Sequence, residues 1–367
     1  METATVTTCA VRGVEPVPVT VECAVSGNAI PAIEIAGMRD SDAAESRLRI
    51  RSALRASGFE LGNRNVAFSV APSGVGRLGG SGFDLALAVA YLAVTRQIDP
   101  SIAEGRMFIG ELMLSGNVRA EGVDLYNTSR CAAGNGMELV TGAAGADAQY
   151  PCEYLELASL DGLRDGSMTL RRHAWPNGKP EVPDVVQVLP SGNVMLLGSR
   201  KAALELVSSH AGSLPALGPE ELGDVASIYS AARADCGRVA NGERPFRAPH
   251  CSVTAVGMLG GGRPVRPGEV ALAHGGVLFL EDVQEFAPTV LQALRQPVAE
   301  GLVRIARAEG VYEMPARFQL VCSAPPCPCG HYGDPKVECA CSANRVRAYQ
   351  DRLLGIAKKL GCEVLHV

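Results

Sequence analysis

Asn193-Val-Met-Leu-Leu-Gly198-Ser-Arg-Lys201 is the most informative segment in the second half of this 367-residue chain. It has the apolar strand, the glycine turn and the lysine of a nucleotide-binding P-loop, but most of the phosphate-binding loop is missing. A P-loop has the pattern GxxxxGK[ST], because its backbone N–H groups surround the phosphates and its Ser or Thr hydroxyl holds Mg²⁺. Here two residues separate Gly198 from Lys201, and Ala202 follows. Taken alone, the stretch favours the other interpretation, an ordinary buried strand (Val194 to Leu197) before an amphipathic helix (Ala202 to Ser209).

A second apolar strand, residues 276–280, ends in Glu281 and Asp282. An apolar strand that closes on two acids is typical of a Walker B segment, in which one carboxylate serves Mg²⁺ and the other orients the attacking water. Acids after a buried strand also occur as helix N-caps, so both interpretations stay open at this point. A helix over 291–298 and a third apolar strand over 318–322 continue the alternation of an α/β domain.

The first half also alternates strands and helices. Strands are predicted over 17–25, 32–36, 66–71 and 107–114, the last turned by Gly116-Asn117. Asp42 and Glu45 have the spacing of a capping box, which predicts a helix from there to Gly58. Its arginines (Arg47, Arg49, Arg51 and Arg55) are interpreted as a solvated helix surface. The glycine-rich stretch 74–82 precedes a buried helix over 83–94, and it is either an anion-binding turn or a tight turn packed on the sheet.

The length of the chain and a Gly- and Pro-rich stretch near its middle predict two domains. A chain of this size exceeds one comfortable core, and the polar, Gly- and Pro-rich stretch 161–183 interrupts the strand and helix signals. We therefore place a first domain at 1–175, a linker at 176–183 and a second domain at 184–367.

Charge and hydropathy exclude several classes of protein. The chain has 34 basic and 39 acidic residues and a net charge of −5, so no overall positive field attracts nucleic acid or an anionic membrane. No apolar run has the length of a spanning helix, and the first residues do not have the pattern of a secretory signal. We expect a cytoplasmic protein that does not enter a membrane.

Four of the twelve cysteines form one cluster. Cys327-x-Cys329 and, nine residues later, Cys339-x-Cys341 supply two close pairs of soft ligands, the set that favours tetrahedral Zn²⁺ in a closed structural site. Neighbouring prolines and glycines provide the bends of a small knuckle, and His331 is an alternative ligand. The other interpretation is four unligated, oxidation-prone thiols. The remaining eight cysteines are scattered and are expected to be reduced thiols.

Several stretches point together to one known family: Phe246–His250, Pro267–Asp282, Leu294–Pro297, Ala316–Leu320 and Cys327–Gly330, with Gly79-Gly80, Asp84-Leu85 and Phe108–Gly116 in the first half. In this order they resemble the ComM/YifB proteins, whose AAA+ domain is related to the magnesium chelatase I subunit. The resemblance covers nearly the whole chain. It implies an α/β fold with an N-terminal domain similar to ribosomal protein S5 domain 2 and the Lon C-terminal domain, followed by a P-loop AAA+ core. It also implies a hexameric, ATP-driven DNA branch-migration helicase of natural transformation.

The chain departs from this family at the nucleotide site. The P-loop is shortened at Gly198 to Lys201, and Asp184–Gln187 runs almost directly into the following strand without the family's intervening helix. The Walker B acids are reversed as Glu281-Asp282, and Pro325 stands where the family has its polar sensor Asn.

Two further departures concern the end of the domain. Lys358-Lys359-Leu360 replaces the segment of the arginine finger, a residue worth ~10³–10⁵ in rate in comparable enzymes. The resemblance places the helical lid beyond Val367, so we expect a truncated core without a lid. Because phosphoryl transfer is catalysed by positioning and charge neutralisation, these departures together predict loss of turnover. Lys201 and Glu281 are expected to remain close as an ion pair.

The favoured function is therefore a degenerate ComM-like pseudo-ATPase that serves as a binding or assembly module. Structural zinc is expected, ATP and Mg²⁺ are not, and the partners implied are branched or single-stranded DNA and an AAA+ homo- or hetero-oligomer. Arg247, Arg263 and Arg266, with the cysteine knuckle, are the candidate DNA face or a former subunit interface. The alternative is an ATP-binding motor, for branch migration or of magnesium-chelatase type, with an unconventional site.

A peptidase is the rival interpretation of the first domain. A Lon-type dyad needs a Ser at the start of the glycine-flanked helix and a Lys downstream to deprotonate it. Ser81 is near the required position, but the stretch 121–126 that should hold the lysine has none. Peptidase activity is therefore not expected.

Overall fold

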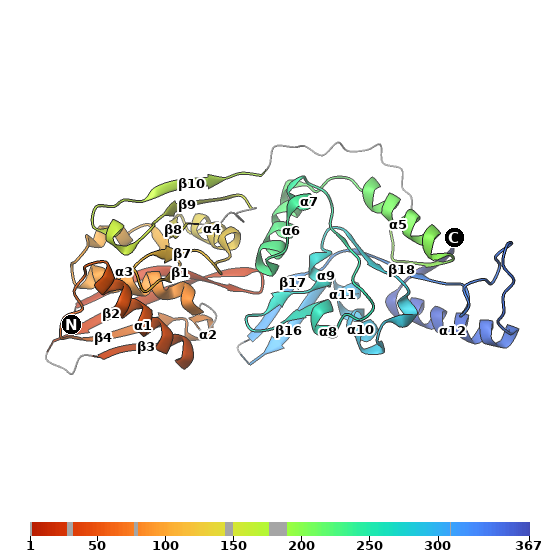
Figure 1. The fold of residues 1–367 in the computed structure, drawn as a ribbon, viewed down its shortest axis with the longest axis horizontal. Coiled ribbons are helices and arrows are strands. Elements are labelled where there is room, and N and C mark those ends of the chain that lie inside the picture. Colours follow the sequence, from red (N-terminus) through yellow and green to blue (C-terminus); the bar gives the residue numbers. More distant parts are fainter. Residues whose placement is uncertain (1, 28–31, 77–79, 144–149, 176–188, 309) are drawn as a thin grey trace. The chain divides into compact units, whose positions relative to one another are not determined.

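The computed structural model of the chain describes all residues except 1, 28–31, 77–79, 144–149, 176–188 and 309 (Figure 1). The chain divides into two compact units, one of Met1–Trp175 and one of Pro176–Ala306 with Val311–Val367, residues 307–310 aside. The expected linker 176–183, the stretch 184–187 and Gly79 lie outside the described residues.

An eight-stranded mixed sheet forms the first unit, in the order β10, β9, β8, β5, β1, β2, β4, β3. The bounds are β1 Glu2–Arg12, β2 Glu15–Ser26, β3 Ala32–Ala36, β4 Asn65–Ala71, β5 Arg106–Phe108, β8 Glu138–Thr141, β9 Cys152–Glu156 and β10 Thr169–His173, with a separate hairpin of β6 Glu111–Leu112 and β7 Val118–Arg119. β1 is central because it pairs antiparallel with β2 along its whole length and parallel with β5.

Helices pack on both faces of this sheet: α1 Asp40–Ala56 and α3 Asp84–Val94 on one, α4 Leu125–Gly134 on the other, while α2 Ser73–Gly76 is a short turn of helix. Alternation along β1 explains the two faces, because successive side chains of a strand point to opposite sides. Val6 and Ala10 belong to the core around α3, whereas Cys9 packs with Cys131 of α4. Every residue of α3 is buried, as the apolar stretch predicted.

The second unit contains a five-stranded parallel sheet in the order β12, β15, β18, β11, β19. The strands are β11 Val194–Leu197, β12 Phe246–Arg247, β15 Val277–Leu280, β18 Gln319–Ala324 and β19 Glu363–His366; the two hairpins are β13 Gly260–Gly261 with β14 Arg266–Pro267, and β16 Leu302–Arg307 with β17 Gly310–Pro315. The helices are α5 Arg200–Ser213, α6 Pro219–Ala232, α7 Gly237–Ala240, α8 Ala255–Leu259, α9 Glu269–Leu272, α10 Pro288–Ala293, α11 Arg295–Glu300 and α12 Ala343–Leu360. Because the strands are parallel, their carboxyl ends meet at one edge, where ligands of open α/β sheets bind.

Most predicted elements are confirmed, and three differ. The helix α1 begins at Asp40, not at a capping box, because Arg39 is its N-cap and pairs with Asp42 at 2.9 Å. The strand predicted over 107–114 breaks at Gly110, whose N–H donates to the carbonyl of Gly82 (2.8 Å) instead of continuing the ladder.

The third difference is the helix predicted over 291–298, which is divided into α10 and α11 at Leu294. The strands β1 and β19, the β16–β17 hairpin and the helix α12 were not predicted from the sequence.

Candidate nucleotide site and cysteine cluster

The candidate residues of the nucleotide site lie at the carboxyl edge of the parallel sheet. Gly198 follows β11, Glu281 and Asp282 follow β15, and Pro325 follows β18. The order of the strands explains this convergence, since β18 pairs with both β11 and β15. The sheet thus brings together the two stretches that the sequence suggested as P-loop and Walker B.

Gly198 is required by close packing and not by its backbone angles. Its N–H donates to the carbonyl of Ala324 (3.1 Å), and an added Cβ would lie 1.9 Å from the carbonyl oxygen of Val367. Ser199 then caps α5, because its side-chain oxygen accepts from the N–H of Ala202 at 3.1 Å. The chain passes from strand to helix within two residues, which leaves no loop of backbone N–H groups to surround a triphosphate.

The expected ion pair between Lys201 and Glu281 is wrong. Arg200 binds Glu281 instead, with Nε and Nη2 donating to the two carboxylate oxygens at 2.6 and 2.8 Å. The side chain of Lys201 is 87% exposed and pairs with Glu205 at 3.8 Å, one turn along the same helix. A planar guanidinium suits a bidentate contact with a carboxylate better than an ammonium group does, which explains the choice of partner.

Asp282 lies in the left-handed region of the backbone (φ 52°), and its N–H donates to the hydroxyl of buried Ser323 at 3.4 Å. The side chain of Tyr349, on α12, lies within range of the negative charge of Asp282. Burial, and then the charges of Asp282 and Glu285, raise the pKa of Tyr349 to about 12.

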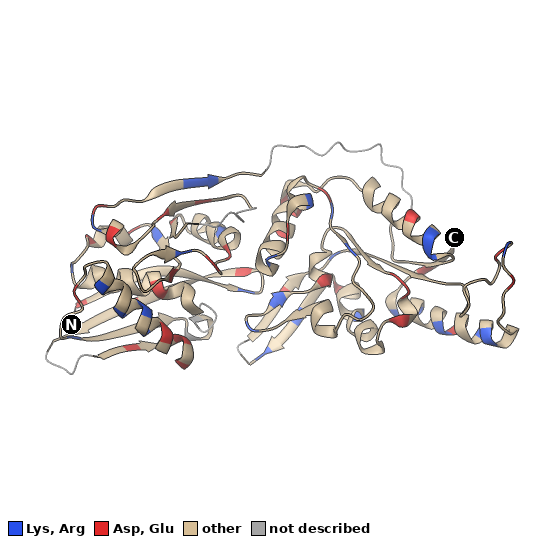
Figure 2. Ribbon diagram, in the orientation of Figure 1, with Lys and Arg blue, Asp and Glu red and all other residues tan. Residues whose placement is uncertain are grey.

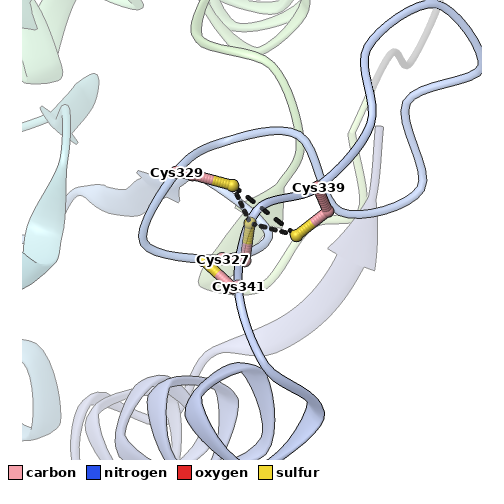
Figure 3. A group of neighbouring side chains, drawn as sticks. All are labelled: Cys327, Cys329, Cys339 and Cys341. Carbon is pink, nitrogen blue, oxygen red and sulfur yellow. Dashed lines mark hydrogen bonds between the residues drawn. The ribbon is translucent and has the colours of Figure 1, made fainter.

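The four thiols of the cysteine cluster converge after β18 (Figure 3). Their sulfur atoms all lie within 4.8 Å of one another. The sulfur of Cys327 is 3.3 Å from that of Cys329 and 3.7 Å from that of Cys339, and the sulfurs of Cys329 and Cys339 are 3.5 Å apart. Cys327 is buried, and the N–H of Tyr332 donates to its sulfur (3.3 Å). The backbone N–H of His331, and then the Cys327 thiol, lower the pKa of Cys329 to about 6.

This donor set fits zinc. Zn–S bonds of ~2.3 Å place the sulfurs of a tetrahedron roughly 3.8 Å apart, close to the separations present. His331 pairs with Asp334 at 3.6 Å, and all four cysteines are gathered without it. The amide of Gln350 on α12 donates to the carbonyl of Pro326 (3.1 Å) and anchors the knuckle to the domain. A four-cysteine group at Cys327, Cys329, Cys339 and Cys341 can therefore hold a structural zinc ion.

Ser81 is not placed for a Lon-type dyad. Its hydroxyl donates to Glu111 at 3.0 Å, and residues 1–175 contain no lysine. A Ser–Lys pair cannot form within this unit, since the residue type that must deprotonate the serine is missing.

Arg49 was interpreted as a solvated arginine, and this is wrong. Its side chain is 16% exposed and pairs with Asp84, which is fully buried at the start of α3. The hydroxyl of Ser46 donates to the same carboxylate (2.5 Å), and the N–H of Leu112 lies 3.4 Å from it. Burial raises the pKa of Asp84, although the hydrogen bonds from Arg49 and Ser46 lower it.

The candidate DNA face is partly engaged within the unit. Arg247 donates to both carboxylate oxygens of Glu269 at 2.7 and 2.8 Å, which joins β12 to α9. Arg266 is exposed. Arg247 is therefore a structural ion pair, and the charge of this surface is lower than the sequence suggested.

Among the described residues, no helix has the length and apolar character needed to cross a membrane.

Comparisons with known proteins cover both units. A family model described as magnesium chelatase, subunit ChlI, matches residues 184–359, and one described as subunit ChlI of Mg-chelatase matches residues 21–135. The uncharacterized protein YifB of Salmonella typhimurium is 32% identical over 377 residues, 97% of this chain and 74% of its own. Competence protein ComM of Haemophilus influenzae is 30% identical over 390 residues, with the same two shares. An uncharacterized protein of Mycobacterium tuberculosis strain H37Rv is 32% identical over 381 residues, 94% of this chain and 73% of its own.

Proposed function

The chain belongs to the magnesium-chelatase-like AAA+ family of YifB and ComM, and from this we propose that it is a pseudo-ATPase that acts as a binding or assembly module. The observation that carries the proposal is the bidentate ion pair between the guanidinium of Arg200 and the carboxylate of Glu281. A Walker B acid must be free to serve Mg²⁺ or the attacking water. Here that acid is neutralised by the residue before the lysine, and Lys201 turns away to Glu205.

Three other features support the loss of turnover. The turn at Gly198 offers no phosphate loop, Pro325 has no side-chain donor at the sensor position, and lysines occupy the segment of the arginine finger. In an active enzyme of this kind, the phosphate loop, the polar sensor and the arginine finger each stabilise the charge of the transferred phosphoryl group. We therefore interpret Gly198, Lys201, Glu281 and Asp282 as the remnant of a nucleotide site.

Calorimetric titration with ATP and with ADP, each with and without Mg²⁺, tests this proposal. We expect no saturable heat and no phosphate release above the blank. Saturable binding that Lys201→Ala weakens at least tenfold, while Lys336→Ala leaves it unchanged, would instead support an ATP-binding motor with an unconventional site. Lys336 is the matched control because it is an exposed lysine in the knuckle loop.

The proposed partners follow from the family and from the retained sheet. We propose that the second unit assembles with AAA+ subunits of its own or of a related kind, and that the N-terminal unit has the S5 domain 2-like fold. The DNA component of the proposal predicts salt-dependent binding to branched or single-stranded DNA, because phosphate contacts release counterions. Binding that is independent of salt and unchanged by Arg266→Ala would remove the DNA component.

We also propose that zinc is bound and is architectural. The knuckle follows β18 directly and is held to α12 through Gln350, so a metal there fixes the helix to the sheet. No ligand position is left open by four cysteines, which is typical of structural and not catalytic zinc.

A further inference from the structure

A cavity of about 620 Å³ lies in the second unit, between the α10–α11 segment and α12. Its size is within the range of small-molecule sites, roughly 300–1,000 Å³. Apolar side chains form much of its wall: Phe286, Leu291, Ile356 and Leu360. Gly198, Lys201, Glu281 and Asp282 do not line it, whereas Lys359 and Leu360, from the segment that replaces the arginine finger, do.

The polar part of the wall is cationic. Arg295 of α11 and Arg352 and Lys359 of α12 line the cavity, and none of the described lining residues is acidic. Arg352 donates one hydrogen bond to the carbonyl of Gln284 (3.0 Å), which fixes the guanidinium but does not neutralise it. The basic residues of α12 are blue in Figure 2. Three cations beside an apolar wall are complementary to a ligand with an anionic head and an apolar body.

Gly355 lines the cavity without adding a side chain to it. It lies inside α12 and lines the cavity, and an added Cβ there would meet no atom within 4 Å. Glycine inside a helix is less favourable than alanine by ~1 kcal/mol. No close contact and no positive φ requires glycine at this position. There is therefore space in front of this position for a larger side chain.

From this cavity, its cations and its glycine, we propose that the second unit binds a small amphipathic anion, an acyl or aryl carboxylate. The apolar body lies against Phe286, Leu291 and Ile356, and the carboxylate is held by Arg295, Arg352 and Lys359. A nucleotide is a poorer match, because a triphosphate needs backbone donors or a metal and the lining here is largely apolar. The proposal does not depend on whether the protein hydrolyses ATP.

Direct titration with decanoate tests the class of ligand, with decanol and decylamine as chain-matched neutral and cationic comparisons. We expect saturable binding of decanoate that is at least tenfold tighter than that of decanol, and no saturable binding of decylamine. Equal binding of decanoate and decanol would overturn the anionic part of the proposal. Displacement of decanoate by ATP at comparable concentration would overturn the assignment to a carboxylate site.

Two pairs of variants locate the site. Gly355→Leu fills the cavity, and its control is Gly212→Leu in α5, where an added Cβ also meets no atom within 4 Å. Lys359→Glu reverses a lining charge, and its control is Lys358→Glu, the preceding residue, which does not line the cavity. Decanoate binding should weaken at least tenfold in Gly355→Leu and Lys359→Glu and stay within twofold in both controls. Equal weakening in a variant and its control would overturn the location, and the charge pair decides it if Gly355→Leu does not fold.

Discussion

The buried ion pair of the first unit gives the sharpest prediction about stability. Arg49→Met keeps the unbranched apolar part of the side chain but leaves the fully buried carboxylate of Asp84 without its cation. Removing one partner of a buried pair costs ~3–5 kcal/mol, because the remaining charge is uncompensated. Arg49 is only 16% exposed, so solvent screening reduces this little, and we expect about 3 kcal/mol at pH 7. Arg51→Met, on the exposed surface of the same helix, should change the free energy of unfolding by less than about 0.5 kcal/mol.

Urea unfolding followed by tryptophan fluorescence measures this effect. The only tryptophan, Trp175, belongs to the first unit and packs edge-on against Tyr150, with 6.3 Å between ring centroids. Its signal therefore reports the unit that contains the mutation, which matters because a chain of two units need not unfold in one step.

The pH dependence checks the mechanism. Burial raises the pKa of Asp84, so the folded state binds this proton more readily than the unfolded state, and stability falls as the pH rises through the folded pKa. Loss of the guanidinium should raise that pKa further. The deficit of Arg49→Met should thus be smaller at pH 5 than at pH 7, by up to about 1.4 kcal/mol for each tenfold gain in the proton affinity of Asp84. A deficit no larger than that of Arg51→Met, or one that grows towards pH 5, would refute the reasoning.

The remaining predictions concern the second unit. Protein purified without chelator should carry about one zinc ion per chain by mass spectrometry, and Cys339→Ser should lose most of it; wild-type protein without zinc would contradict the four-cysteine site. Gly198→Ala should destabilise the unit by about 1–3 kcal/mol in urea unfolding, because the new methyl group would overlap the carbonyl of Val367, whereas Gly212→Ala should not destabilise it. Arg200→Ala should change stability by less than about 1 kcal/mol, since the pair is solvent-exposed, and should leave phosphate release at the blank; a gain of hydrolysis would mean that the ion pair alone silences the site.

The sequence predicted the second unit's central strands well because each is a short, continuous apolar run. The strands at 194–197 and 277–280 are buried on both faces, the situation in which composition alone identifies a parallel strand. The cluster of four cysteines was also predictable from the sequence, because the two Cys-x-Cys pairs are separated by only nine residues and a short loop brings them together.

What the sequence could not predict depended on contacts between distant residues. Nothing in the local sequence separates Arg49 from the other arginines of its helix, and its partner Asp84 lies 35 residues away. The strand β1 was missed because its threonines interrupt the alternation of apolar and polar side chains that identifies a half-buried strand. Signals of this kind become visible only when the tertiary partner is known.

The competition between Arg200 and Lys201 for Glu281 follows from helix geometry. Shortening the turn between β11 and α5 makes Ser199 the N-cap, so the first helical residue is Arg200 and the next is Lys201. Successive residues of a helix point about 100° apart, so only one of the two can face the edge of the sheet. Arg200 faces Glu281, and Lys201 is directed to Glu205, four residues further along the helix. In the proposed pseudo-ATPase, a single shortening of this turn accounts both for the missing phosphate loop and for the contact of Arg200, in place of Lys201, with Glu281.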